Sequence, residues 1–384
     1  MKIILCVTGS IAATEDLKLV HQLQRHGFDV ECFMTDDACD IITPLSMEFA
    51  TKNPVVTKIT GNVEHVKNAQ ADLILVAPAT ANTISKFAYK IADTSVTTLL
   101  LTASGYKTPI LFVPSMHISM YHAIEENINK IKEKHPEVRF IEPTNEERKA
   151  KFPSKHDIVL EVERMVSENK LDGMNVVITA GGTFEEIDAM RGITNRSSGK
   201  MGVEIAKEAY RQGANVTLIC GITKTHIPKT LRRINVESSR EMAEVVKKEI
   251  INADIFVSTA AVSDFEVENK SDLKYSSDND LSLNLRRLPK ILEQVREINS
   301  NIFIVGFKAE AGLSEGDLIK KATNKKNQYD VDLMVANDIL VEGAGPGCED
   351  NEVYLISDDG CEKLCLDSKW HISQKIIDRI YKLI

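Results

Sequence analysis

The fold is decided by the stretch Val176-Val177-Ile178-Thr179-Ala180-Gly181-Gly182-Thr183, in which a short apolar run ends in a glycine turn. Such a run is typical of a strand buried on both faces of a parallel sheet. A helical pattern follows at Met201–Gln212. The stretch therefore predicts a strand, a turn with bare backbone and a helix, the unit from which doubly wound α/β domains are built.

The same plan continues toward the C-terminus. Further buried strands are predicted at Val216–Cys220, Ile255–Ala260, Phe303–Gly306, Leu333–Ala336 and Val353–Ser357. Helices are predicted at Glu241–Ile251 and, as a closing amphipathic helix, at Trp370–Ile384. The alternation over Leu281–Leu285 indicates an exposed strand or hairpin.

The first half of the chain alternates in the same way. Apolar runs predict strands at Ile3–Thr8, Val30–Met34, Leu73–Pro78 and Ile110–Pro114, and helices are predicted at Glu15–His26, Tyr121–Lys134 and Asp157–Asn169. From about Glu142 a polar, basic stretch interrupts the pattern. We therefore expect two doubly wound α/β domains with mainly parallel sheets, residues 1–170 and 171–384.

The composition excludes several classes of function. The 384 residues carry a formal net charge of −9, which argues against broad nucleic-acid binding. The apolar N-terminus is too short for a signal peptide, and no apolar run reaches the length of a membrane span. Seven scattered cysteines fit a reducing compartment, so we expect a cytoplasmic protein.

Three polar turns follow strands of the first half. Thr8-Gly9-Ser10-Ile11 leads into a helix and suits an anion, although a plain structural turn would look the same. Ala77-Pro78-Ala79-Thr80-Ala81-Asn82 and Ser115-Met116-His117 lie where doubly wound sheets bind ligands. His65 begins a predicted helix, and by itself it is equally consistent with an ordinary surface histidine.

Together these residues resemble the flavin mononucleotide (FMN)-dependent cysteine decarboxylase family, specifically phosphopantothenoylcysteine decarboxylase, over nearly all of residues 1–135. The resemblance implies a flavodoxin-like flavoprotein domain in which His65 is catalytic and Met116 and His117 bind substrate. It also implies that the flavin oxidises the substrate thiol to a thioaldehyde, carbon dioxide leaves and the hydride is returned. The residues expected to bind FMN are Gly9, Ser10, Ile11, Thr35, Pro78, Thr80, Asn82 and Asp93.

The chain departs from this family at two points. His117 stands where the family usually has an asparagine that holds the substrate carboxylate, and we expect the histidine to retain that contact. The family's proton-donating cysteine has no counterpart in residues 138–160, where Lys149 and Lys151 are candidates for ordering a flap or donating the proton.

The strongest motif of the chain is Asn195-Arg196-Ser197-Ser198-Gly199-Lys200-Met201-Gly202. Its glycines leave the backbone bare, and its hydroxyl and cationic side chains complete an anion cradle at the start of a helix. Polar turns around Ala261, Asp264 and Phe307 end further predicted strands and should converge on the same edge of the sheet.

This half resembles phosphopantothenate–cysteine ligase over residues 174–384. The resemblance implies that CTP, accompanied by Mg²⁺, activates the carboxylate of phosphopantothenate as an acyl nucleotide, which the amine of cysteine attacks. It assigns Asn195 to the acyl intermediate and Arg191 and Ala261 to substrate. The nucleotide-binding candidates are Ser197, Asp264, Lys274, Phe307 and Lys325.

Two of these assignments stay open. Lys274, expected to stabilise the transferring phosphate, lies in a shortened loop motif and can also be read as a solvated lysine. Lys325 belongs to a lysine-rich face that needs no ligand to explain it. Leu288 replaces an asparagine usual in the family, and spacing alone names no magnesium ligands.

The sequence therefore predicts a bifunctional enzyme of coenzyme A biosynthesis that ligates cysteine to phosphopantothenate and decarboxylates the product to phosphopantetheine. Two alternatives remain: an active ligase whose flavin domain no longer completes decarboxylation, and a regulatory binding protein built on the flavin fold. The resemblance implies homo-oligomers, trimeric for flavin halves and dimeric for ligase halves, which together close as a dodecamer.

Overall fold

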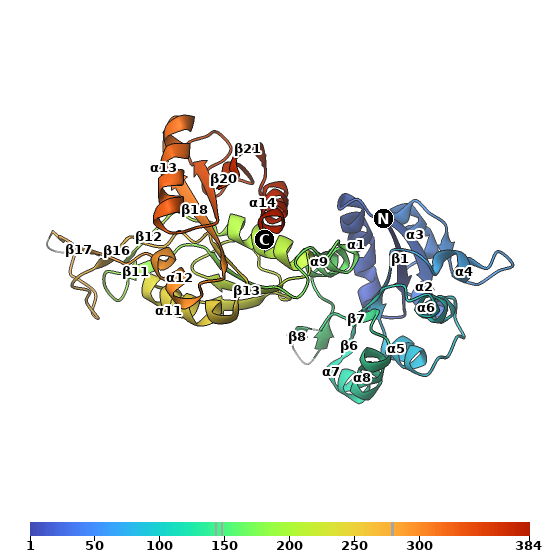
Figure 1. Cartoon of the computed structure of the whole chain (residues 1–384). Helices are drawn as coiled ribbons and strands as arrows, with labels where there is room; N and C mark the ends of the chain where they lie inside the picture. Colours follow the sequence, from blue (N-terminus) through green and yellow to red (C-terminus); the bar gives the residue numbers. More distant parts are fainter. Residues whose placement is uncertain (143, 147–148, 278–279) are drawn as a thin grey trace. The chain divides into compact units, whose positions relative to one another are not determined.

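The computed structural model describes residues 1–142, 144–146, 149–277 and 280–384. The chain divides into two compact units, Met1–Ser167 and Glu168–Ile384, each with its own sheet and core (Figure 1). In the part of the chain that is described, every helix is too short or too polar to cross a membrane.

The first unit is built on a six-stranded parallel sheet. Its strand order is β3-β2-β1-β4-β5-β7, with β1 at Lys2–Val7, β2 at Asp29–Met34, β3 at Val55–Val56, β4 at Leu73–Ala79, β5 at Ile110–Pro114 and β7 at Val138–Phe140. All seven residues of β4 are buried, as the continuous apolar run predicts.

Helices cover both faces of this sheet. Alternate residues of β1 point to opposite faces: Ile3 and Leu5 pack with α1, α3 and α9, whereas Ile4 and Cys6 pack with α5, α6 and α8. The helices are η1 (Ile11–Glu15), α1 (Asp16–Arg25), α2 (Asp36–Cys39), α3 (Pro44–Thr51), α4 (Glu64–Asn68), α5 (Ala81–Ala88), α6 (Ser95–Gly105), α7 (Ile118–Ala123), α8 (Glu125–Lys134) and α9 (Lys155–Val166).

Two expectations for this unit need correction. The helix predicted at Tyr121–Lys134 is divided at Ile124, whose backbone leaves the helical region (φ −108°, ψ 7°), so that α7 and α8 are separate. The polar stretch after Glu142 contains two short strands, β8 (Thr144–Glu146) and β9 (Lys149–Lys151). They form a small antiparallel sheet with β6 (Met116–His117), in which the backbone of Lys149 pairs with that of His117.

The second unit is built on an eight-stranded sheet in the order β14-β13-β10-β15-β18-β19-β20-β21. Its strands are β10 (Asn175–Ala180), β13 (Asn215–Cys220), β14 (Arg232–Asn235), β15 (Ile255–Ser258), β18 (Phe303–Glu310), β19 (Leu333–Asp338), β20 (Asp350–Ser357) and β21 (Gly360–Ser368). The pairs from β14 to β19 are parallel, and β20 and β21 continue the sheet antiparallel.

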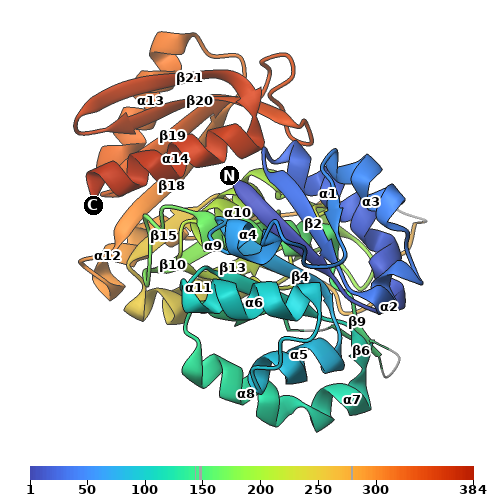
Figure 2. The ribbon, with the colours of Figure 1, turned by 90° about the vertical axis from the view of Figure 1, so that its right-hand side faces the viewer.

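Helices cover both faces of this sheet as well. Val176 and Ile178 of β10 pack with α10 and α14 on one face, and Val177 packs with α11 and α13 on the other. In Figure 2, α14 lies beside β20 and β21, against which it packs, and it also packs against α10. The helices are α10 (Lys200–Arg211), α11 (Ser239–Glu249), η2 (Ile250–Asn252), η3 (Ile291–Gln294), α12 (Val295–Ile298), α13 (Glu315–Gln328) and α14 (Lys369–Leu383).

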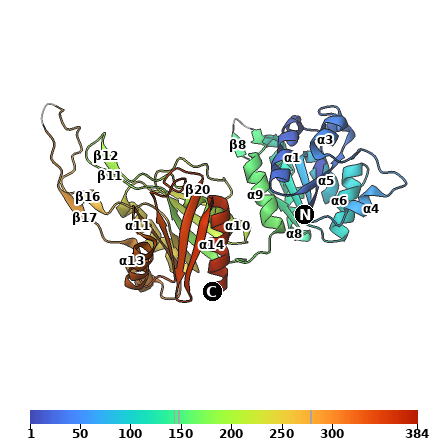
Figure 3. The same cartoon turned by 90° about the horizontal axis from the view of Figure 1, so that it is seen from above.

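Two small hairpins extend from one end of the second unit, as Figures 1 and 3 show. One pairs β11 (Phe184–Glu186) with β12 (Gly192–Thr194), and the other pairs β16 (Phe265–Val267) with β17 (Leu285–Arg287). The exposed strand expected at Leu281–Leu285 is therefore misplaced: β17 begins only at Leu285, because its partner strand β16 sets the pairing.

Candidate active sites

Each sheet has one point at which the strand order reverses direction. In the first unit this point lies between β1 and β4, from which the following strands are added toward opposite edges of the sheet. In the second unit it lies between β10 and β15. The turns that leave neighbouring strands at such a point diverge, so a crevice opens at the carboxyl ends of the strands. The polar turns singled out in the sequence follow these four strands or their neighbours.

A polar cavity of about 510 Å³ lies at this point of the first unit. Its volume falls in the usual range for small-molecule sites. Among the residues expected to bind a cofactor, five line it: Gly9, Thr35, Thr80, Asn82 and Asp93. It is also lined by residues that we did not predict, including Thr8, Thr57, Lys58, Ile59, Thr83, Lys86, Thr94 and Thr97.

Hydroxyl groups fix the two turns that border this cavity. Thr8 Oγ1 donates to the carbonyl oxygen of Pro78 at 2.6 Å and accepts from the backbone N–H of Thr80 at 3.1 Å. Thr80 Oγ1 caps α5 by accepting from the backbone N–H of Thr83. The turns after β1 and β4 are thus joined, and they present hydroxyl and amide groups to the cavity.

One ion pair lies at the wall of the cavity. Lys86 Nζ contacts Asp93 Oδ2 at 2.7 Å, and this hydrogen bond lowers the pKa of the Asp93 carboxyl. Asp93 also faces Thr97, whose hydroxyl forms a capping box with Thr94 at the start of α6. Asp93 is therefore held as an anion beside a lysine that a phosphorylated ligand could also engage.

The remaining predicted residues of this unit do not line the cavity. Ser10 caps η1 and contacts Ser115 Oγ at 3.2 Å, while Ile11 is exposed. His117 is exposed and caps α7 through Ser119. His65 lies in α4, and its Nδ1 atom is buried without a hydrogen-bond partner among the described residues.

In the second unit, glycines bring the Asn195–Gly202 motif against the strand ends. Gly199 caps α10 with a φ of +73°, a conformation that side chains disfavour. A Cβ on Gly202 would lie 2.3 Å from Thr259 Oγ1 and 2.8 Å from Ala180 Cβ. The start of α10 therefore approaches β10 and the turn after β15 as closely as the backbone allows.

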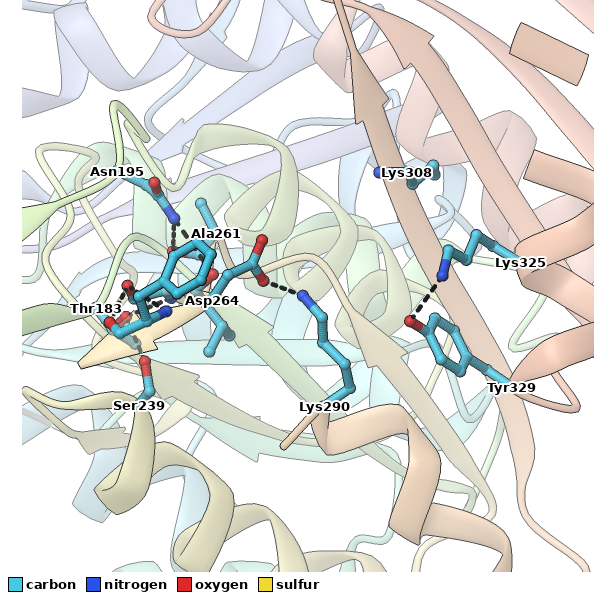
Figure 4. A network of polar contacts seen from close by, with 12 residues as sticks. Thr183, Asn195, Ser239, Ala261, Asp264, Lys290, Lys308, Lys325 and Tyr329 are labelled. Atoms are coloured by element: carbon cyan, nitrogen blue, oxygen red, sulfur yellow. Dashed lines mark hydrogen bonds and ion pairs between the residues drawn. The ribbon is translucent and has the colours of Figure 1, made fainter. Parts of the chain in front are cut away.

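The motif is tied to that turn by its asparagine (Figure 4). Asn195 Nδ2 donates to the carbonyl oxygens of Ala261 at 3.1 Å and Val262 at 3.2 Å. Ser197 Oγ accepts from the backbone N–H of Gly199 at 3.3 Å. Three predicted residues, Asn195, Ala261 and Ser197, thus lie within one connected loop system.

A buried hydrogen-bonded chain supports the loops from below. Ser239 Oγ donates its only hydrogen to Glu185 Oε1. Thr183 Oγ1, which lies 2.9 Å from Ser239 Oγ, is therefore the donor in the hydrogen bond between these two hydroxyl groups. Thr183 Oγ1 in turn accepts from the backbone N–H of Ser263 at 2.9 Å. This chain joins β11, the start of α11 and the turn after β15.

Two of the predicted nucleotide residues, Asp264 and Lys325, are seen in Figure 4 together with Lys290 and Lys308. Lys290 reaches Asp264 and forms an ion pair with it, while Lys325 contacts Tyr329 Oη at 3.3 Å and Gln328. Phe307 lies on β18, half-buried against the core. Leu288 is buried and lines an apolar cavity of about 330 Å³ beside Lys290, so an apolar residue suits that position.

The two other predicted cations lie on the hairpins. Arg191 ends the turn between β11 and β12, and Lys274 is exposed in the segment between β16 and β17. Arg191 is held by Asp188, a residue that we did not predict. The three-residue spacing from Asp188 to Arg191 is a signal that could have revealed this pair, whereas Lys290 has no comparable local signal.

Two units, one with a parallel and one with a mainly parallel sheet, each with polar groups at its switch point, define a two-domain doubly wound α/β protein. The Flavoprotein family model matches residues 1–167, and the model described as DNA/pantothenate metabolism flavoprotein C-terminal domain matches residues 171–384. The chain belongs to the family of coenzyme A biosynthesis bifunctional proteins CoaBC.

Three relatives illustrate this membership. The CoaBC protein of Thermococcus kodakarensis is 47% identical over 100% of this chain and 95% of its own length. That of Methanocaldococcus jannaschii is 40% identical over 100% of this chain and 94% of its own. That of Bacillus subtilis is 35% identical over 99% of this chain and 97% of its own.

Proposed function

We propose that the second unit joins cysteine to phosphopantothenate with CTP and that the first unit decarboxylates the product with FMN. The chain is a bifunctional enzyme of coenzyme A biosynthesis, a phosphopantothenate–cysteine ligase and a phosphopantothenoylcysteine decarboxylase. The observation that supports the assignment of the ligase site is the contact of Asn195 with Ala261 and Val262, which fixes the Asn195 loop at the switch point of the second unit.

Ligation must bring together reactants that repel each other. The carboxylate of phosphopantothenate attacks the α-phosphorus of the nucleotide and releases pyrophosphate, and the amine of cysteine then displaces the nucleoside monophosphate from the acyl carbon. Fixed donors and cations at the point of reaction lower both barriers. We assign substrate contacts to Arg191, Asn195 and Ala261, and stabilisation of the transferring phosphate to Lys274.

The nucleotide would extend from the Asn195 loop toward the lysines of Figure 4. We assign Ser197, Asp264, Phe307 and Lys325 to nucleotide binding, and CTP as the preferred nucleotide. Within the described residues no cluster of three His, Cys, Asp or Glu side chains could hold a metal ion. We propose that magnesium accompanies the triphosphate.

The residues around the first cavity fit a flavin nucleotide. Thr8, Thr80 and Asn82 offer neutral donors and acceptors, and the cavity volume of about 510 Å³ suits a ligand of this size class. When bound, FMN would supply the acceptor and donor of hydride for the substrate. We assign FMN binding to Gly9, Ser10, Ile11, Thr35, Pro78, Thr80, Asn82 and Asp93.

The residues of the first unit that we assign to the substrate lie outside this cavity. We assign proton exchange with the substrate to His65, whose Nδ1 is buried and has no hydrogen-bond partner among the described residues. We assign Met116 and His117 to the carboxylate of the substrate. Both lie on β6, whose backbone pairs with the β9 segment.

Assembly and location complete the proposal. We propose a homo-oligomer with trimeric first units and dimeric second units, a dodecamer when both contacts close, and light scattering would give its mass. We also propose a cytoplasmic location, since all seven cysteines are free thiols.

Two assays on the purified chain test the function. Phosphopantothenate, cysteine and either CTP or ATP are supplied first, and formation of phosphopantothenoylcysteine is followed. Phosphopantothenoylcysteine is then supplied alone, and release of carbon dioxide is measured. Ligation without carbon dioxide release, in a purified protein that shows flavin absorbance, would show that the first unit binds flavin without completing decarboxylation, and failure of both reactions would refute the proposal.

A further inference from the structure

Asp188 is a buried carboxylate at the turn between β11 and β12. Its side chain has no exposed surface. Oδ1 accepts from the backbone N–H groups of Met190 at 2.9 Å and Arg191 at 2.8 Å. Oδ2 accepts from Arg191 Nε at 2.9 Å, from Arg191 Nη2, and from the backbone N–H of Tyr275 at 3.1 Å. One carboxylate thus binds two segments that lie 87 positions apart.

The second segment is the loop that carries Lys274. Arg191 Nη2 also donates to the carbonyl oxygen of Tyr275 at 2.9 Å, so Asp188 and Arg191 hold Tyr275 by both its backbone groups. Nearby, the backbone N–H of Ser271 donates to the carbonyl oxygen of Ile187 at 3.1 Å. The residue next to Lys274 is therefore fixed to the β11–β12 turn.

The arrangement leaves the cationic side chains accessible while their supports are buried. Arg191 keeps 42% of its side-chain surface exposed although Asp188 keeps none. Lys274 is exposed as well. Because the carboxylate is desolvated, its hydrogen bonds are stronger than surface contacts and cannot be replaced by water. The hydrogen bonds from Arg191 hold the pKa of the Asp188 carboxyl far below its usual range.

We propose that Asp188 is the positioning residue of the ligase site, which sets the Arg191 guanidinium and the Lys274 loop in one mutual geometry. This inference rests on the proposed ligase function. Because its side chain is buried, Asp188 acts through Arg191 and the Tyr275 backbone. Its effect should therefore depend on those partners.

The variant Asp188→Asn tests this role with little change of volume. An asparagine can still accept from the N–H groups of Met190 and Arg191, but its amide nitrogen would face the donors of Arg191 and Tyr275. We expect kcat/KM for ligation to fall about 100-fold, as misplacement of reacting groups by about 1 Å can produce. Asp272→Asn, an exposed carboxylate of the same loop, is the matched control and should leave ligation unchanged.

A double-mutant cycle separates positioning from a general structural role. If Asp188 acts partly through Arg191, Asp188→Asn should cause a smaller loss in an Arg191→Met background than in the parent, because only its bond to the Tyr275 N–H is then left to lose. Fully additive losses would overturn the proposal. So would an Asp188→Asn variant that ligates like the parent.

Hydrogen exchange gives a readout that does not require ligase activity. The amide of Tyr275 should exchange faster in Asp188→Asn than in the parent, while the thermal transition stays in place. If the parent ligates nothing, the proposed function fails, yet the exchange measurement still decides whether Asp188 orders the loop. Unchanged exchange at Tyr275 would sink the inference even in an active enzyme.

A second variant covers the case in which Asp188→Asn does not fold. Tyr275→Pro removes the backbone N–H that Asp188 binds together with the tyrosine side chain, whereas Tyr275→Ala removes the side chain and retains that N–H. We expect Tyr275→Pro to reduce ligation at least about tenfold relative to Tyr275→Ala. Equal activity of the two variants would contradict the proposal.

Discussion

The side-chain amide nitrogen of Asn195 lies 3.1 Å from the carbonyl oxygen of Ala261 and donates a hydrogen bond to it. The same nitrogen donates to Val262, so the amide oxygen of Asn195 is left for other partners. A residue that anchors the turn after β15 through its nitrogen can thus offer its oxygen to a ligand.

An aspartate at this position should disable ligation. In Asn195→Asp a carboxylate oxygen would face two carbonyl oxygens, so two hydrogen bonds are lost and repulsion replaces them. We expect ligation to fall by about 100-fold or more, measured as phosphopantothenoylcysteine formed. Asn301→Asp, at the amino end of β18, should ligate normally; comparable losses in both variants would contradict the assignment.

Replacement of His65 should affect only decarboxylation. A general acid or base typically contributes about 100-fold to 10⁴-fold, so carbon dioxide release by His65→Asn should fall within that range. Ligation should be unchanged. The control is His122→Asn, an exposed histidine that pairs with Glu125. Parental carbon dioxide release by His65→Asn would show that His65 has no catalytic role.

Two glycine-to-alanine changes should shift stability in opposite directions. Gly202→Ala places a Cβ 2.3 Å from Thr259 Oγ1 and should destabilise the second unit by about 1–3 kcal/mol. Gly316 lies in α13 with nothing within 4 Å of an added Cβ, so Gly316→Ala should stabilise by about 0.5–1 kcal/mol. Thermal unfolding measures both, and a stabilised Gly202→Ala would refute the close packing described above.

Asp16 should make the stability of the first unit dependent on pH. It is fully buried, neither oxygen has a hydrogen-bond partner among the described residues, and burial raises the pKa of its carboxyl well above its usual range. The unfolded carboxyl ionises near pH 3.9. Between that pH and the raised folded value the native state holds the extra proton, so stability falls as pH rises.

The variant Asp16→Asn should remove this slope. We expect it to unfold at a higher temperature than the parent at pH 7, with a gain of about 1 kcal/mol or more, and to match the parent below about pH 4. Asp40→Asn, an exposed carboxylate, should leave the profile unchanged. An Asp16→Asn variant that is less stable than the parent at pH 7 would contradict the expected linkage.

The sequence predicts the buried strands well because their apolar runs are continuous. The run over Val176–Thr179 lies within β10, and that over Leu73–Pro78 lies within β4. Strands β8 and β9 were not predicted, since Thr144–Glu146 and Lys149–Lys151 carry no apolar pattern and become strands only by pairing with each other and with β6. The division at Ile124 was missed because hydrophobic periodicity continues through a local change of backbone angles.

The sites could be predicted in part for a similar reason. A turn that follows a buried strand must lie at the sheet edge, so Thr80 and Ala261 were placed by topology, whereas Asn195 follows β12 of a small hairpin and was placed by its motif. The contact of Asp188 with Tyr275 and that of Thr183 with Ser239 join residues 87 and 56 positions apart, and no periodic pattern connects them. Such pairings are set by how loops fold over the strand ends.

Strand β21 closes the second sheet and pairs with β20 along one side. An outer strand of nine residues offers backbone donors and acceptors on which another chain could grow by strand addition. This strand carries the charged residues Glu362, Lys363 and Asp367. Charged side chains on an edge strand disfavour pairing with the edge strand of another chain. Replacing Glu362 and Asp367 with apolar residues would remove this protection and favour aggregation through the exposed edge of β21.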